Sequence, residues 1–173
     1  MPSTSSPRGR SLSLGGSSKT PRFTVRGSYN LELKTFSAVL KFTLQLEDQT
    51  SQFYQQASLS NKCAQAKQLF LELAENSRKR KQSLEKTARE SVDHSLLEPI
   101  SGLLEEDHAG TTAFSETMSF TDALGAARQL EERMQKFYSE AGEKIRFIPA
   151  VSRLYRRCAQ DRAKALTLLQ GVS

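Results

Sequence analysis

A nine-residue pattern occurs twice in this chain, and it constrains the fold more than any other feature. Residues 46–54 and residues 130–138 both read Leu-Glu, then five variable residues, then Phe-Tyr. The two copies lie 84 residues apart, and the same offset pairs Leu84 with Leu168 further downstream. An internal repeat at a fixed offset predicts that one helix–loop–helix unit occurs twice.

Apolar spacing predicts four helices. The residue types that favour helices, such as Ala, Leu, Glu, Lys, Gln and Arg, dominate the chain after the first 30 residues. Apolar residues recur at spacings of three and four over residues 32–57 and 62–92. The same spacing returns over residues 121–146. Pro149 then opens a last helix, which we expect to end at Gly171.

The stretch between the second and third helices breaks this periodicity. Pro99, Gly102 and Gly110 interrupt residues 95–120, and an apolar cluster at 96–104 predicts a short helical turn packed against the bundle. A connection of about 25 residues is long for a compact domain. It is long enough to return along a whole bundle, so we expect an all-α four-helix bundle with a long crossover.

The chain divides into a tail and one folded domain. Residues 1–30 are rich in Ser, Gly, Thr and Pro and contain no acidic residue. The tail supplies most of the net charge of +6 through five basic residues: Arg8, Arg10, Lys19, Arg22 and Arg26. Such a segment buries too little apolar surface to fold alone. We expect residues 31–173 to form the bundle, with helix pairs at about 32–94 and 121–170.

Three interpretations of the tail stay open. It is a disordered segment that keeps the chain in solution, or a segment ordered by docking on an acidic partner or nucleic acid. Alternatively it is an organelle transit peptide, because such peptides are rich in Ser and Arg and poor in acid. We expect a cytoplasmic location, with an organelle as the alternative.

Composition excludes several classes of protein. No apolar run reaches the roughly 18 residues of a membrane-spanning helix, and no signal peptide follows Met1, so we expect a soluble chain. Cys63 and Cys158 are too few for a disulfide scaffold and should fill core or boundary positions. We expect His94 and His108 to lie on the surface.

The two helix pairs, the crossover and the repeated pattern together resemble the ferritin-like superfamily, and its rubrerythrin-like branch most. The resemblance covers about residues 32–169. In that family the first helix of each pair supplies a Glu and the second supplies Glu-x-x-His, and these side chains hold two metal ions. Glu47 and Glu131 match the first-helix glutamates, while Tyr54 and Tyr138 match the aromatic residue that commonly follows.

The second helix of each pair departs from the family motif. At an offset of 84, the Glu-x-x-His positions fall on Ser77 and Arg80 in one pair, and on Asp161 and Lys164 in the other. Both histidines are therefore missing. Arg cannot ligate a metal ion, and Lys would first have to lose its proton. We expect no cofactor, and an ion-pair network in which Arg80 and Lys164 neutralise the first-helix glutamates.

The lost ligands favour a non-catalytic structural or adaptor subunit that attaches to another protein or assembly through its tail. A homodimer is compatible with the resemblance, since family members often pair through their first two helices. One alternative is an oxidoreductase whose iron or manganese is held without histidine by Glu47, Glu131, Asp161 and Glu75. The other, ranked last, is salt-sensitive binding of nucleic acid through the tail and the basic run 78–81.

Overall fold

The computed structural model describes residues 31–91, 99–110 and 113–172 of the chain. This part contains four long α-helices and one 3₁₀ helix: α1 (Phe36–Leu59), η1 (Asn61–Ala66), α2 (Lys67–Glu90), α3 (Phe120–Lys144) and α4 (Pro149–Gln170). Within these ranges there is no strand, only an isolated backbone bridge between Glu32 and Leu104. For this part of the chain, the prediction of an all-α fold with four helices is confirmed.

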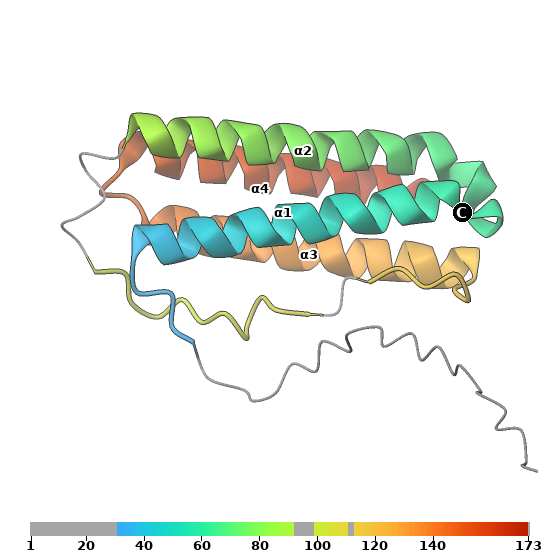
Figure 1. Cartoon of the computed structure of the whole chain (residues 1–173), viewed down its shortest axis with the longest axis horizontal. Helices are drawn as coiled ribbons and strands as arrows, with labels where there is room; N and C mark the ends of the chain where they lie inside the picture. Colours follow the sequence, from blue (N-terminus) through green and yellow to red (C-terminus); the bar gives the residue numbers. More distant parts are fainter. Residues whose placement is uncertain (1–30, 92–98, 111–112, 173) are drawn as a thin grey trace, which may run out of the picture.

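The four helices lie side by side with their axes roughly aligned (Figure 1). α1 packs closely against α2, and α3 packs closely against α4. The helices of each pair are antiparallel, but α2 and α3 point in the same direction (Figure 1). The connection between α2 and α3 therefore returns along the length of the bundle, as a two-pair topology with a long crossover requires.

Local sequence explains how the helices begin. The side chain of Thr35 caps α1 by accepting a hydrogen bond from the N–H of Ala38 at 3.1 Å. Ser119 and Asp122 form a reciprocal capping box at the start of α3, which satisfies two backbone donors at once. Pro149 lies in the first turn of α4, where its missing N–H leaves no gap in the helix.

Each helix buries one apolar face against the others. Phe42 of α1 meets Phe137 of α3 edge to face, with ring centroids 5.3 Å apart. Tyr54 of α1 stacks on Phe70 of α2 at 5.8 Å. Burying a side chain of this size contributes about 1.5–3 kcal/mol relative to leaving it exposed. These aromatic contacts join α1 to both of its neighbours.

Backbone hydrogen bonds join residues 100–105 of the crossover to the residues just before α1. The N–H of Leu33 donates to the carbonyl of Leu103, and the N–H of Ile100 donates to the carbonyl of Lys34, both at 2.9 Å. Ile100 and Leu103 are buried, and neither lies in a helix. The predicted helical turn is wrong for residues 100–104, because their backbone groups pair with the extended chain instead.

The crossover also carries a buried histidine. The ring of His108 is 0% exposed and packs edge-on against Phe137, with centroids 5.2 Å apart. Its Nε2 lies 3.0 Å from a carboxylate oxygen of Glu140. The prediction of a surface position for His108 is wrong, because the crossover presses this ring against α3. His94 lies outside the described residues.

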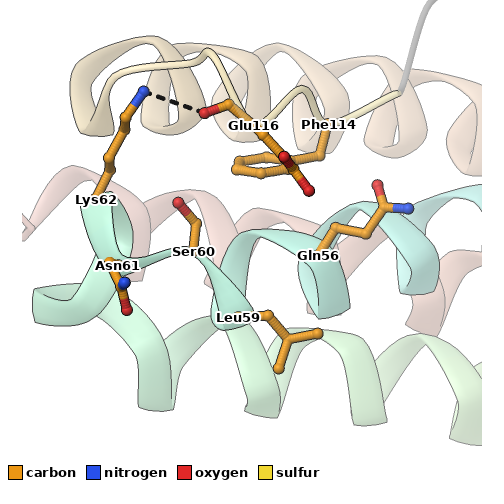
Figure 2. Close-up of a pocket in the computed structure, with 7 residues that line it drawn as sticks. All are labelled: Gln56, Leu59, Ser60, Asn61, Lys62, Phe114 and Glu116. Carbon is orange, nitrogen blue, oxygen red and sulfur yellow. Dashed lines mark hydrogen bonds between the residues drawn. The ribbon is translucent and has the colours of Figure 1, made fainter.

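The last part of the crossover docks beside a hollow of about 510 Å³ at the end of α1 (Figure 2). Lys62 Nζ donates to the backbone carbonyls of Glu116 and Thr117 at 3.1 and 3.2 Å. The ring of Phe114 packs edge-on against Phe53, with centroids 6.0 Å apart. The hollow is lined by Gln56, Leu59, Ser60, Asn61, Lys62, Phe114 and Glu116. These contacts hold the crossover against α1 near the start of α3.

Among the residues with an assigned structure, none of the helices combines the length and apolar character needed to cross a bilayer. The tail, residues 1–30, lies outside the described ranges. The roles expected for its five basic residues therefore stay predictions.

Candidate functional site

Two buried glutamates lie at the centre of the bundle. Glu47 of α1 is 1% exposed and Glu131 of α3 is 0% exposed. They are the glutamates of the two repeat copies, so the repeat brings equivalent positions together from opposite halves of the chain. A buried carboxylate is tolerated only when hydrogen bonds or a counter-charge compensate it. The surrounding side chains supply both.

Each repeat copy provides the tyrosine that binds the glutamate of the other copy. Tyr54 of α1 donates its hydroxyl hydrogen to Glu131 Oε1 at 2.7 Å. Tyr138 of α3 donates to Glu47 Oε1 at 2.5 Å. The glutamate and tyrosine of one copy are seven residues apart, which is about two helical turns and places both on one face. The repeated pattern therefore places each tyrosine where it binds the glutamate of the other copy.

A buried arginine from α4 lies between the two glutamates. Arg162 is 0% exposed, and its Nη1 donates to both carboxylate oxygens of Glu131 at 2.9 and 3.1 Å. Its Nη2 donates to Glu47 Oε1 at 2.6 Å. Hydrogen bonds between ionised partners are shorter and roughly twice as strong as neutral ones. The guanidinium therefore joins the two repeat copies at their centre.

α2 completes this central network. Arg80 Nε donates to Glu47 Oε1 at 3.2 Å, and Arg80 Nη2 donates to the hydroxyl of Ser77 at 3.0 Å. The Arg80 side chain is 11% exposed, so it reaches the glutamate from the edge of the bundle. Arg80 and Arg162 together place two positive charges against the negative charges of Glu47 and Glu131. Each of these four residues comes from a different helix.

The pKa values follow from burial and from these partners. Burial alone would raise the pKa of Glu47, but the guanidinium of Arg162 and the hydroxyl of Tyr138 help to hold it below its usual value. Burial first, and then the carboxylate that each binds, raise the pKa values of Tyr54 and Tyr138 well above normal. Burial lowers the pKa of Arg162, but the carboxylates led by Glu131 outweigh it and raise that pKa. These four groups therefore keep fixed protonation states near neutral pH.

The structure brings together six of the eight side chains that the sequence assigns to the centre: Glu47, Tyr54, Ser77, Arg80, Glu131 and Tyr138. Asp161 and Lys164 lie elsewhere. Lys164 Nζ donates to Asp161 Oδ1 at 3.0 Å on the surface of α4, and the two side chains are 75% and 39% exposed. The placement of these two residues at the centre is wrong.

The reason is a difference of one residue between the two helix pairs. The offset of 84 relates α1 to α3, but buried positions of α2 match those of α4 at an offset of 85. The matched pairs are Phe70 with Tyr155, Leu73 with Cys158, Ala74 with Ala159, Ser77 with Arg162, and Leu84 with Leu169. Matched buried positions of α3 and α4 are therefore one residue further apart along the chain than those of α1 and α2, although the segment between the two helices is shorter (145–148, against 60–66). Arg162 takes the place equivalent to Ser77, and Ala165 the place equivalent to Arg80.

A sequence signal for Arg162 does exist. It lies within the apolar stripe of α4, whose buried members are Val151, Tyr155, Cys158, Ala159, Ala165 and Leu169. A single arginine inside such a stripe predicts a buried cation that needs acidic partners.

The central network offers few ligands for a metal ion. Within the described ranges, no group of three or more His, Cys, Asp or Glu side chains is placed to share an ion. Glu47 Oε2 and Arg162 Nε are buried without a hydrogen-bond partner in this part of the chain. The remaining oxygens of the two glutamates are already bonded to arginine or tyrosine.

Both cysteines are buried free thiols. Burial, with the charge of Glu47 as the next cause, raises the pKa of Cys158 to about 12. The reactive form of cysteine is the thiolate, so this side chain is an inert core residue at neutral pH.

Comparison with models of known protein families, with curated proteins and with solved structures found no match. The geometry of the central network is therefore the basis for assigning a function.

Proposed function

We propose that this chain is a non-catalytic structural or adaptor subunit, built on a degenerate ferritin-like bundle that holds no metal. The position of Arg162 carries the proposal, because its guanidinium joins Glu47 and Glu131 where members of that superfamily hold their ions. The two helix pairs and the long crossover support the resemblance.

The central side chains do not suit a pair of metal ions. Two iron or manganese ions carry about four positive charges and require several carboxylates together with neutral imidazoles. Here two carboxylates are present, and each is bonded to Arg162 and to a tyrosine hydroxyl. An arginine has no lone pair to offer a metal ion and keeps its charge at any working pH. It occupies the space between the carboxylates and repels cations.

The oxidoreductase alternative has less support. Two of its four proposed ligands lie on the surface, where Asp161 binds Lys164 and Glu75 Oε2 accepts a hydrogen bond from Arg78 at 3.1 Å. Neither contributes to the central network around Glu47.

A bundle with a neutralised centre is suited to act as a rigid body. The four charged side chains come from four different helices, so the network fixes the helices relative to one another. In our proposal the basic tail, residues 1–30, attaches this body to another protein or a larger assembly by charge attraction.

Metal content tests the proposal. Untagged protein is purified from cells grown with added iron and manganese and analysed by elemental mass spectrometry. We expect far less than one metal ion per chain, and a melting temperature that a chelator leaves unchanged. A content of about two ions per chain, the family value, would contradict the proposal and favour the oxidoreductase.

Binding to DNA tests the remaining alternative. If the tail serves nucleic acid, the full chain should bind duplex DNA with an affinity that falls steeply with salt and is lost on deleting residues 1–30. A structural subunit should show no such binding at physiological salt.

A further inference from the structure

α2 and α4 form the face of the bundle opposite the crossover. The described part of the crossover packs on α1 and α3, as the contacts of Phe114 with Phe53 and of His108 with Phe137 show. In Figure 1, α2 and α4 lie on the other side of the bundle. The described crossover residues therefore leave this face uncovered.

A hollow of about 420 Å³ lies between these two helices, lined by side chains from residues 72–83 of α2 and 154–168 of α4. We call it the α2–α4 groove. Because the two helices are antiparallel, later residues of α2 lie beside earlier residues of α4 (Figure 1). The volume falls in the range of small-ligand sites, roughly 300–1,000 Å³. The groove is therefore large enough for a small molecule.

One end of the groove is cationic. Lys79 and Arg80 of α2 line it together with Arg157 of α4. Within the described ranges no carboxylate pairs with Lys79 or Arg157, whereas the neighbouring Arg78 and Arg156 each pair with a glutamate. This end therefore presents two positive charges that the described part of the chain does not balance.

Arg80 adds a positioned hydrogen-bond donor to the cationic end. Its side chain is 11% exposed, and its Nε and Nη2 are held by Glu47 and Ser77. Its third nitrogen, Nη1, makes no hydrogen bond with any described residue and remains in contact with solvent. The central network thus fixes the guanidinium and leaves one nitrogen for a ligand in the groove.

The other end of the groove is largely apolar. Leu73 of α2 and Ala165 of α4 line it as buried side chains, and Leu168 of α4 is 50% exposed beside them. Glu72 lies at the same end and would repel an anion there. The groove therefore favours a ligand with one anionic end and one apolar end.

Asp161 lines the middle of the groove but does not oppose an anion at the cationic end. Lys164, which also lines the groove, lies with its Nζ 3.0 Å from Asp161 Oδ1. The two side chains neutralise each other locally.

We propose that the α2–α4 groove binds a phosphate monoester that carries an apolar substituent. At pH 7 a phosphate monoester carries a charge of about −1.5 to −2 and three acceptor oxygens. The charge matches Lys79 and Arg157, and the oxygens can accept from both side chains and from Arg80 Nη1. The substituent lies along Leu73 and Leu168, where its removal from water is favourable. A single carboxylate of an acidic peptide would leave one of the two cations unbalanced.

Isothermal titration calorimetry of the full chain with hexyl phosphate tests the proposal. We expect binding that weakens as the salt concentration rises. Inorganic phosphate should bind more weakly, because it lacks the apolar part. The double variant Lys79→Gln/Arg157→Gln should weaken the binding of hexyl phosphate by about tenfold or more. Both residues are exposed and lie outside the central network, so this variant should fold.

Lys41→Gln/Lys67→Gln is the matched control, since it removes two exposed lysines outside the groove and changes the net charge by the same amount. It should bind hexyl phosphate as the wild type does. Far-UV circular dichroism should show that both double variants keep their helices.

Co-sedimentation with vesicles distinguishes two sources of the phosphate, since phosphatidic acid is also a phosphate monoester with an apolar part. Binding to phosphatidylcholine vesicles only when they contain phosphatidic acid, with loss in the groove variant, supports a lipid headgroup as the ligand. Binding of hexyl phosphate without binding of these vesicles supports a soluble ligand.

Failure to bind either phosphate probe overturns the proposal. So does binding that the groove variant retains, which would place the phosphate on the tail, or an equal loss in the control. Binding of polyglutamate without binding of the phosphate probes would also overturn it, in favour of an acidic protein partner.

Discussion

Arg162 compensates two buried carboxylates with one side chain. The planar guanidinium can do this because its donors form a rigid fork, so one nitrogen binds Glu131 while another binds Glu47. A lysine carries its charge on one nitrogen and lacks that fork. A lysine at the centre, where the sequence predicted Lys164, would therefore be a poor substitute for Arg162. Lys164 lies on the surface instead.

The stability of the chain should fall in acid because of Glu47. Its pKa in the folded chain lies below the usual value, so the unfolded chain takes up the proton first as the pH falls. The contribution is therefore complete above about pH 5 and decreases as the pH drops through about 4.3 towards the folded pKa. Urea unfolding between pH 7 and pH 3 would measure it. If Glu47→Gln loses as much stability over this range as the wild type, the explanation fails.

The helices were largely predictable, but one register was not. Apolar spacing locates α1 to α4 to within a few residues, because each helix must bury one face. The repeated pattern also brings Glu47 and Glu131 together with their tyrosines. The additional residue falls near the end of α3, where the helix stops and no periodic pattern reveals an insertion. A shift of one residue there moved the predicted site from Arg162 to Asp161.

The crossover was the least predictable element, since its contacts depend on long-range packing. One of these contacts, the burial of His108 in the crossover, should be measurable as a pH dependence of stability. Burial lowers the pKa of His108, although Glu140 acts in the opposite direction and Lys136 adds to the lowering. Because the unfolded chain then binds this proton more readily, the stability should decrease as the pH falls below about 6.5.

Thermal unfolding between pH 7.5 and pH 5.5 would measure this effect of His108. The variant His108→Gln cannot titrate, so its melting temperature should change less over the same range. An equal decrease in both proteins would show that another group is responsible.

Across the whole molecule, the central network joins the two helix pairs. α1 and α2 pack closely, as do α3 and α4, whereas fewer contacts link one pair to the other. The ionic contact of Arg162 with Glu47 crosses that boundary, and so do the two tyrosine hydrogen bonds. In our proposal, a protein cation takes the joining role that metal ions would have in a ferritin-like bundle.

Two methionine variants test whether Arg162 is the counter-charge that the two buried glutamates share. Arg162→Met leaves two buried carboxylates without their shared counter-charge, which should cost about 3–5 kcal/mol of unfolding free energy. Lys164→Met alters a side chain that is 75% exposed, and should change the stability by no more than about 0.5 kcal/mol. Equilibrium urea unfolding at pH 7, followed by circular dichroism, gives both values. A large loss for Arg162→Met alone supports the account, and equal effects of the two substitutions would contradict it.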